Sequence, residues 1–440
     1  MRKRVLVLGA GSVAPPLAQY LLNESDINLT VADQFLNRAE KLVSKSPHAQ
    51  ALHLDIRNGE KTRNLISKAD LVISILPNKF HLDIANHCVA LKKNMITASY
   101  VSKSIKNLHS EAKKQGILIL NETGLDPGID HMEAARIIDK INRDEGSVTG
   151  FISYCGGLPD PKSNTNPFGY KFSWSPKGVL LASKKPAQYL KKNKKVFIPP
   201  SRLFQNPATI HIKGIGELEG YPNRNSVPYI DLYQIHSTKT MFRGTLRYKG
   251  WCLFMHQAGK IGLLSEKIQN WGQISRKDFI RRITGLPEPE NIKSGLVSHF
   301  NLGKDSPFFQ CMDFLEFFSK KALPLKKGSP LDVLVALMEE KLLYKKGERD
   351  MIILQHRITA EYEKINHKEI ISTLVDFGSP DGDTAMSRTV GLPLAIAAKN
   401  ILNRRIRSTG AQIPVTPEIY EPILKELKKS GIEFETSIKE

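Results

Sequence analysis

Residues 4–14 read RVLVLGAGSVA, and this stretch decides the fold. A short apolar run, which predicts a β-strand, leads into Gly9, Gly11 and Ala14, the G-x-G-x-x-A fingerprint of dinucleotide-binding folds. Gly9 permits a tight turn, Gly11 lets the backbone approach a diphosphate, and Ala14 keeps the next helix close to the sheet. A helical pattern follows at residues 14–22, so the start of a helix is expected to face the diphosphate.

Apolar runs alternate with helical patterns up to residue 125, as in a doubly wound parallel sheet. The run LVISIL at 71–76 is apolar almost throughout, which is typical of a strand buried on both faces of such a sheet. The sequence therefore predicts an α/β Rossmann domain. We expect its six strands at residues 4–8, 27–31, 51–54, 71–76, 94–98 and 117–120.

Proline and glycine become frequent after Gly124, where we expect a second, α+β domain. Its strands are predicted at residues 149–154, 209–214, 240–248, 350–358 and 369–376, and its helices at 132–141 and 253–264. A short connection around residues 364–367 predicts a hairpin, so the sheet is at least partly antiparallel. Residues 265–345 show helical periodicity without a strand-like run, which predicts a helical insertion. Helices are also expected at 385–402 and 417–430.

No stretch approaches the ~20 apolar residues of a membrane helix, and the glycines interrupt the N-terminal apolar run too early for a signal peptide. We therefore expect a cytoplasmic protein with no membrane contact. The four cysteines show no CxxC spacing, which predicts reduced thiols and no metal site.

The formal net charge is +20, yet the lysines are spread along the chain apart from one dense run at 191–195. No nucleic-acid-binding signature accompanies this charge, so we expect no nucleic-acid partner. A basic cleft for a small polyanionic substrate fits the charge at least as well.

Polar side chains follow several predicted strands, at the sheet edge where ligands of open α/β folds bind. Asp33 ends the second strand, 22 residues after Gly11, where a carboxylate hydrogen-bonds the adenosine ribose. This favours NAD over NADP, although Arg38 would offset the carboxylate, and Asp33 is alternatively an ordinary turn residue. Asp55 and Pro77 follow the third and fourth strands as adenine and nicotinamide contacts, or as plain loop residues.

Tyr100, Asp126 and His131 follow the fifth and sixth strands, near the expected nicotinamide end. They are candidates to handle a proton while a hydride moves to the cofactor. The alternative is structural, because Asp-Pro-Gly at 126–128 is a common turn and His131 reads more readily as a structural residue beside a helix start.

Longer motifs, spread almost end to end, resemble the glutamate-forming saccharopine dehydrogenases, also called saccharopine reductases. They include NETGLDPGIDH at 121–131, YCGGLP at 154–159, NPFGYKFSWSP at 166–176, YPNR at 221–224 and RGTLRY at 243–248. The resemblance implies oxidation of saccharopine to an imine, hydrolysed to L-glutamate and 2-aminoadipate 6-semialdehyde in lysine metabolism, or the reverse reaction.

The resemblance also implies site residues. Arg224 and Arg247 lie in substrate motifs, where each guanidinium would grip one of the three carboxylates of saccharopine. Cys155 lies beside the substrate region and joins Tyr100 and Asp126 as a catalytic candidate, or is a small core residue. The other substrate positions are Ser99, Tyr100, Asp126, Thr245 and Leu246. The cofactor positions of the family fall on Gly11, Ser12, Val13, Ala14, Asp55, Ala98, Leu125, Asp126, Pro127 and Trp174. The expected cofactor site also includes Gly9, Asp33, Ile56, Pro77 and Ser99.

Three regions follow from combining the patterns with the resemblance, which returns the C-terminal chain to the first domain. We expect a Rossmann domain of residues 1–130 plus 386–440, a substrate and dimerisation domain of 131–264 plus 346–385, and a helical insertion of 265–345. The antiparallel sheet offers a dimerisation face, so a homodimer is expected.

The nicotinamide cofactor stays open between NAD and NADP. The familiar eukaryotic members of the family use NADPH and carry an arginine where this chain has Asp33-Gln34. The family thus favours NADP, whereas Asp33 favours NAD. Two other functions stay open as well: a dehydrogenase of another N-linked amine, such as carboxynorspermidine, and a non-catalytic cofactor-binding protein.

Overall fold

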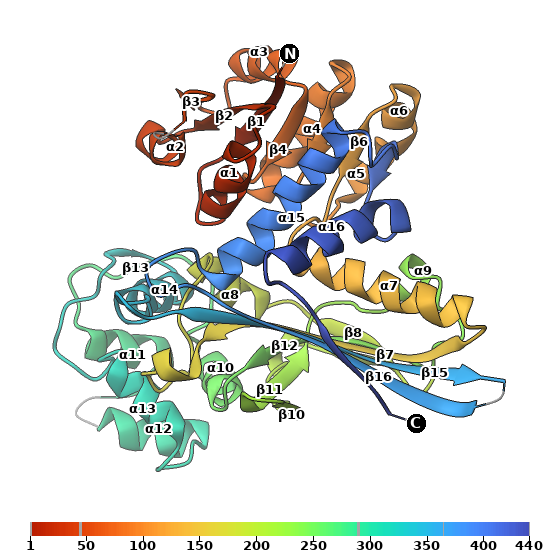
Figure 1. Cartoon of the computed structure of the whole chain (residues 1–440). Coiled ribbons are helices and arrows are strands. Elements are labelled where there is room, and N and C mark those ends of the chain that lie inside the picture. The colour runs from red at the N-terminus through yellow and green to blue at the C-terminus, as the bar shows by residue number, and fades with distance from the viewer. Residues whose placement is uncertain (1, 44–45, 288–290, 364, 440) are drawn as a thin grey trace. The chain divides into compact units, whose positions relative to one another are not determined.

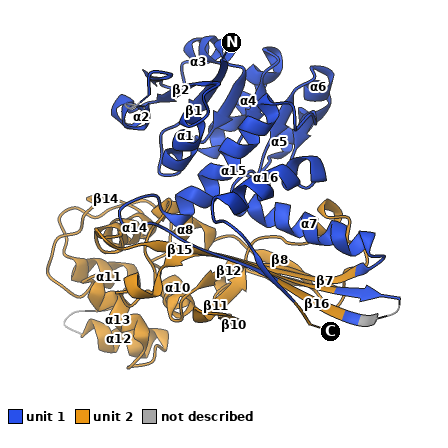
Figure 2. Ribbon diagram, in the orientation of Figure 1, with its two compact units in different colours: residues 1–147, 360–367, 372–437 blue, residues 148–359, 368–371, 438–440 orange. Residues whose placement is uncertain are grey.

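The computed structural model describes residues 2–43, 46–287, 291–363 and 365–439. Contacts between Cα atoms divide the chain into two compact units (Figure 2). Unit 1 comprises residues 1–147, 360–367 and 372–437, and unit 2 comprises residues 148–359, 368–371 and 438–440. The three ranges expected from the sequence stay predictions.

Unit 1 contains a seven-stranded sheet in the order β17-β6-β5-β4-β1-β2-β3, with parallel pairing throughout (Figure 1). This confirms the predicted Rossmann fold. The strands are β1 (Lys3–Leu8), β2 (Ile27–Asp33), β3 (Ala49–His53), β4 (Leu71–Ser74), β5 (Asn94–Ile96), β6 (Leu118–Leu120) and β17 (Gly410–Gln412). The sequence did not predict β17, because its residues Gly-Ala-Gln form no apolar run.

Several helices of unit 1 pack against this sheet. The helices of this unit are α1 (Ala14–Leu22), α2 (Leu36–Val43), α3 (Gly59–Lys68), α4 (His81–Ala90), α5 (Lys103–Asn107), α6 (His109–Lys114), α7 (Ile129–Arg143), α15 (Ala385–Leu402) and α16 (Pro417–Lys429). One core packs Leu6, Leu8 and Val72 of the sheet against Ile84 of α4 and Ile105 of α5. On the other face α15 lies beside α1 and contacts β4 and β5 (Figure 1).

The second sheet is mixed. Its path runs β10-β11-β12-β7-β15-β16-β18, and β8 pairs with β12 and β9. Strand β12 is parallel to β7 and antiparallel to β11, as the prediction of a partly antiparallel sheet requires. The strands are β7 (Ser147–Pro159), β8 (Ala187–Lys191), β9 (Lys194–Ile198), β10 (Ala208–Ile212), β11 (Gly216–Pro222), β12 (Thr240–Arg247), β15 (Asp350–Tyr362), β16 (Ile365–Phe377) and β18 (Glu435–Lys439).

Two sequence predictions about this region were wrong in detail. The connection expected at 364–367 is shorter, because β15 ends at Tyr362 and β16 begins at Ile365; Lys364 lies outside the described residues. The insertion expected to lack strands contains the pair β13 (Gln269–Asn270) and β14 (Lys327–Gly328). Two residues are too few to show an alternating pattern.

The remaining helices belong to unit 2, and four of them, α11 to α14, lie within residues 265–345. They are α8 (Pro176–Ala182), α9 (Tyr229–Leu232), α10 (Trp251–Lys260), α11 (Arg276–Thr284), α12 (Ile292–Phe300), α13 (Pro307–Phe314) and α14 (Pro330–Lys341). In the part of the chain that the structure describes, no helix combines the length and the apolar character needed to cross a bilayer.

Gly391 lets α15 approach the backbone at the start of α1. A Cβ atom at this position would lie 2.6 Å from the carbonyl oxygen of Val13, 3.1 Å from Cγ of Pro16 and 3.2 Å from the nitrogen of Leu17. Because backbone atoms cannot rotate away, only glycine fits this contact. The end of the fingerprint loop therefore packs against α15, although Gly391 comes 378 positions after Val13 in the chain.

We expect Gly391→Ala to lower the free energy of unfolding by about 1–3 kcal/mol, because α15 must shift away from α1. Gly59→Ala is the matched control, since nothing lies within 4 Å of its Cβ position at the start of α3. Urea unfolding followed by circular dichroism measures both variants. Equal stability of the two would contradict the close contact at Gly391.

Candidate functional site

The fingerprint loop is fixed by the carboxylate of Asp33 at the end of β2. One oxygen accepts the N–H of Ala10 at 2.7 Å, and the other accepts the N–H of Phe35 at 2.7 Å. The first turn of α1 contains Pro15 and Pro16, which have no N–H, and the N–H of Ala14 donates to the carbonyl of Gly11 at 3.0 Å. A diphosphate at the predicted position would therefore be held by the helix dipole and by N–H groups of the loop before α1.

Arg38 lies close to the same end of β2. Its guanidinium is 4.5 Å from the ring centroid of Phe35, which is 52% exposed. Stacking on an aromatic ring orients a guanidinium while its N–H groups stay available to an anion.

Asp55 and Ile56 follow β3. The carboxylate of Asp55 pairs with Arg57 at 2.6 Å, and hydrogen bonds from Arg57 lower the pKa of Asp55 to about 2. This pairing favours the loop alternative for Asp55. Ile56 lines a cavity of about 480 Å³ together with Phe80 and residues of α3 and α4.

The loops after β5 and β6 bring the predicted catalytic candidates together. The hydroxyl of Tyr100 donates to Oδ1 of Asp126 at 3.2 Å. Asp126 lies in a closed turn, in which Gly124 donates to the carbonyl of Pro127 at 2.9 Å. Gly128 has φ of 149°, and a Cβ atom there would overlap the backbone of Gly124, so glycine is required for this turn.

His131 is tied to a residue that sequence reasoning did not single out. Its Nε2 lies 2.7 Å from Oε2 of Glu122, and both side chains are buried. The other oxygen of Glu122 accepts the N–H of Val101 at 2.9 Å, and the N–H of Glu122 donates to the carbonyl of Ser99 at 3.1 Å. This arrangement favours the structural alternative for His131. An acidic residue two positions after a buried strand was the available signal for Glu122.

Parallel pairing of β7 and β12 brings the substrate candidates of unit 2 together. Cys155 is in register with Thr245, two residues before Arg247. The guanidinium of Arg247 is buried, 4.8 Å from the ring centroid of Tyr170 and 5.6 Å from that of Trp251. Its Nη1 donates to the carbonyl of Leu246 at 2.7 Å, whereas its Nε has no hydrogen-bond partner among the described residues. No described acidic side chain pairs with it.

Arg224 is exposed and lies just beyond β11, with φ of 54°. Because Asn223 donates to the carbonyl of Arg243, Arg224 is level with the first half of β12, some way along the sheet from Arg247. The two arginines therefore do not meet at one point. Trp174 is 38% exposed and precedes α8.

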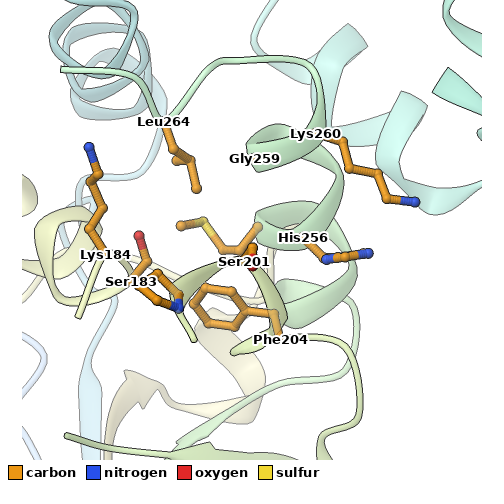
Figure 3. A pocket seen from close by; sticks show the side chains of 10 residues that line it. Ser183, Lys184, Ser201, Phe204, His256, Gly259, Lys260 and Leu264 are labelled. Atoms are coloured by element: carbon orange, nitrogen blue, oxygen red, sulfur yellow. The ribbon is translucent and has the colours of Figure 1, made fainter. Parts of the chain in front are cut away.

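A second cavity, of about 240 Å³, lies in unit 2 (Figure 3). Phe204 and Leu264 line it, whereas the amines of Lys184 and Lys260 point away from it. It offers few polar groups to a charged substrate. Among the described residues, no cluster of histidine, cysteine or acidic side chains is arranged to hold a metal ion.

Comparison with known proteins decides the family. The model of the saccharopine dehydrogenase NADP binding domain matches residues 5–120, and that of the saccharopine dehydrogenase C-terminal domain matches residues 124–432. The chain belongs to the saccharopine dehydrogenase family. This confirms the resemblance seen in the motifs and identifies the chain as an oxidoreductase with a nicotinamide-dinucleotide-binding domain.

Relatives match almost from end to end. Saccharopine dehydrogenase (NADP+, L-glutamate-forming) of Saccharomyces cerevisiae is 36% identical, with 98% of each chain covered. The enzyme of the same name from Schizosaccharomyces pombe is 34% identical, with 99% of this chain and 98% of that one covered. The solved apo structure of the histidine-tagged, L-Glu forming S. cerevisiae enzyme has a TM-score of 0.92 at 35% identity, covering 100% of both chains.

Proposed function

We propose that the chain oxidises saccharopine to L-glutamate and 2-aminoadipate 6-semialdehyde, with NADP+ as the hydride acceptor. End-to-end similarity to two fungal enzymes of this name supports the reaction. The buried guanidinium of Arg247 carries the proposal for substrate binding, because it lacks an acidic partner among the described residues. The cytoplasmic location and the homodimer stay predictions.

Arg247 is suited to a carboxylate that arrives with the substrate. Burying a cation without a counter-ion is costly, and a substrate carboxylate would offset that cost through two charge-assisted hydrogen bonds. The rings of Tyr170 and Trp251, whose centroids are 4.7 Å apart, both contact the guanidinium and orient it. Saccharopine carries three carboxylates, so Arg247 binds one and leaves the others to Arg224 and to hydroxyl donors.

The reaction balances as saccharopine, water and NADP+ giving glutamate, the semialdehyde, NADPH and a proton. The bound nicotinamide supplies the hydride acceptor. The secondary amine loses its proton, and the ε-carbon of the lysine-derived part loses hydride to form the imine. Water then adds to this carbon, which becomes the aldehyde, and glutamate leaves with the nitrogen. We propose that Asp126, in contact with the hydroxyl of Tyr100, takes the amine proton. Cys155 is the third candidate for proton transfer, after Asp126 and Tyr100.

The choice of NADP rests on Arg38. Both oxygens of Asp33 already accept backbone N–H groups, so its carboxylate is committed to the fingerprint loop. Arg38, oriented by Phe35, is available to bind the 2′-phosphate that distinguishes NADP from NAD. This proposal replaces the preference for NAD that Asp33 alone suggested.

Reduced-cofactor formation from saccharopine, measured at 340 nm with NADP+ and NAD+ in parallel, tests the reaction. We expect faster turnover with NADP+. No turnover with either cofactor would contradict the proposed function, and turnover of carboxynorspermidine instead would replace it with that of another amine dehydrogenase. Cofactor binding without turnover of either amine would leave only the non-catalytic function.

We expect Arg38→Ala to raise the dissociation constant of NADPH roughly tenfold or more and to leave that of NADH unchanged, because a hydrogen-bonded charge contact to the 2′-phosphate is lost. Fluorescence titration of the reduced cofactors measures both constants without turnover. Arg63→Ala removes another exposed arginine of unit 1 and serves as the control. Equal losses for NADPH and NADH would rule out a 2′-phosphate contact.

Arg247→Met is expected to raise the Michaelis constant for saccharopine roughly a hundredfold, because a buried charge contact to a carboxylate is lost. The free energy of unfolding should stay unchanged or rise, since methionine removes an unpaired buried cation. Arg282→Met is the control, because Arg282 also stacks on a tryptophan, 5.4 Å from the ring of Trp271. An unchanged Michaelis constant would exclude substrate binding by Arg247.

Asp126→Ala separates proton transfer from orientation. Loss of a general base is expected to lower kcat by roughly 10²–10⁴. Steady-state kinetics with saccharopine varied at saturating NADP+ measures kcat and the Michaelis constant separately. An unchanged kcat with a raised Michaelis constant would show that Asp126 only binds the substrate.

A further inference from the structure

Three hydroxyl groups surround the imidazole of His81, which is fully buried at the start of α4. The Nδ1 atom lies 3.0 Å from Oγ of Ser74, the last residue of β4. The Nε2 atom lies 2.8 Å from Oγ of Ser99 and 3.3 Å from Oγ1 of Thr97. The imidazole therefore connects the ends of β4 and β5 at the carboxyl edge of the sheet.

His81 is neutral near neutral pH, because burial lowers its pKa to about 4. A neutral imidazole has one nitrogen that donates and one that accepts. Two arrangements are possible: Nε2–H donates to Ser99 while Nδ1 accepts from Ser74, or the reverse.

The surrounding hydroxyls select the first arrangement. The 2.8 Å contact between Nε2 and Ser99 needs a hydrogen atom, from one side or the other. If Ser99 supplies it, Nδ1 carries a proton and the hydroxyl hydrogen of Ser74 has no acceptor among the described residues, although Ser74 is fully buried. If Nε2 supplies it, Ser74 donates to Nδ1. The hydroxyl of Thr97 does not distinguish the two arrangements. Ser99 is closer to Nε2 and makes the hydrogen bond with it in both, so the hydrogen of Thr97 is not bound by Nε2 in either.

We propose that His81 is a positioning residue, which donates from Nε2 to Ser99 so that the Ser99 hydroxyl donates in turn to a carboxylate of the substrate. The chain of hydrogen bonds then runs in one direction, from Ser74 through His81 to Ser99. A hydroxyl whose oxygen already accepts a bond presents its hydrogen to a new acceptor, and a carboxylate is the strongest acceptor available.

The substrate is the expected ligand because Ser99 precedes Tyr100, whose hydroxyl contacts Asp126. Arg224 and Arg247 together leave one carboxylate of saccharopine to hydroxyl donors. The identity of this ligand rests on the proposed function, whereas the protonation of His81 does not.

A pair of variants separates the two ends of the imidazole. His81→Gln places its amide near the position of Nε2 and keeps a donor for Ser99, whereas His81→Asn reaches only as far as Nδ1 and keeps the contact with Ser74. We expect His81→Asn and Ser99→Ala each to raise the Michaelis constant for saccharopine about tenfold with kcat within about twofold. We expect His81→Gln to recover most of the affinity.

The double variant His81→Asn with Ser99→Ala shows whether His81 acts through Ser99. If it does, the double variant is no worse than either single variant, because the second change removes nothing further. A Michaelis constant raised about a hundredfold in the double variant, which is the product of the two single effects, would overturn the proposal. The proposal would also fail if only the dissociation constant of NADPH rose, or if His81→Gln and His81→Asn raised the Michaelis constant equally.

Nuclear magnetic resonance reads the tautomer without any turnover. Long-range proton–nitrogen correlation spectra of protein labelled with ¹⁵N-histidine, with the His81 signals assigned by their loss in His81→Gln, are expected to show a neutral ring protonated at Nε2 from pH 5.5 to 9. Protonation at Nδ1, or a cationic ring in this range, would overturn the proposal. Failure of the wild type to oxidise saccharopine would instead contradict the proposed function and the ligand of Ser99, but not this tautomer.

Discussion

The two hydrogen bonds that Asp33 accepts from the backbone hold the fingerprint loop, and the candidate site depends on that loop. The N–H of Ala10 is fixed to the end of β2, so the turn between β1 and α1 cannot open. Gly391 lets α15 press against the backbone at Val13 from below. With the loop held between a carboxylate and a helix, the uncapped start of α1 is aimed at a fixed point, as a dinucleotide diphosphate requires.

Hydrogen bonds between side chains and backbone also position the loops after β5 and β6, but there the side chains are buried. Glu122 contacts His131 and the backbone of Val101, which ties the loop carrying Tyr100 to the start of α7. In a region without water these hydrogen bonds are strong, and breaking one leaves a costly unpaired group. Tyr100 and Asp126 are therefore presented by loops with little freedom to move, which favours precise orientation of a substrate.

The sequence could predict a feature where a local pattern of apolar residues marks it, and could not where the feature depends on contacts with distant residues. The strand at LVISIL and the helix at 385–402 carry apolar patterns that packing alone imposes, so both were predicted. Strands β13, β14 and β17 read Gln-Asn, Lys-Gly and Gly-Ala-Gln, so they contain no apolar run from which a strand could be predicted. The double hydrogen bond of Asp33 was equally invisible, because a sequence gives the position of a carboxylate but not the donors that meet it.

Side-chain partners beyond the local sequence also explain why the candidate site could only be predicted in part. The sequence alone gave no reason to separate Arg247 from other arginines, and only the resemblance marked it. The structure shows the difference: buried Arg276 of α11 has Glu316 at 3.1 Å and Glu340 at 2.9 Å, whereas Arg247 contacts aromatic rings and a carbonyl but no acidic side chain in the described part of the chain.

Arg247 is buried and has no acidic partner among the described residues, which supports the proposed binding of a substrate carboxylate. The presence or absence of a partner of opposite charge also distinguishes Asp55 from Arg38. Asp55 pairs with Arg57, whereas the guanidinium of Arg38 stacks on the ring of Phe35. Charges that the fold satisfies itself stabilise it, and charges that it orients but does not neutralise are the ones available to a ligand. By this criterion the net charge of +20 matters less for function than the few cations held in place without an acidic partner.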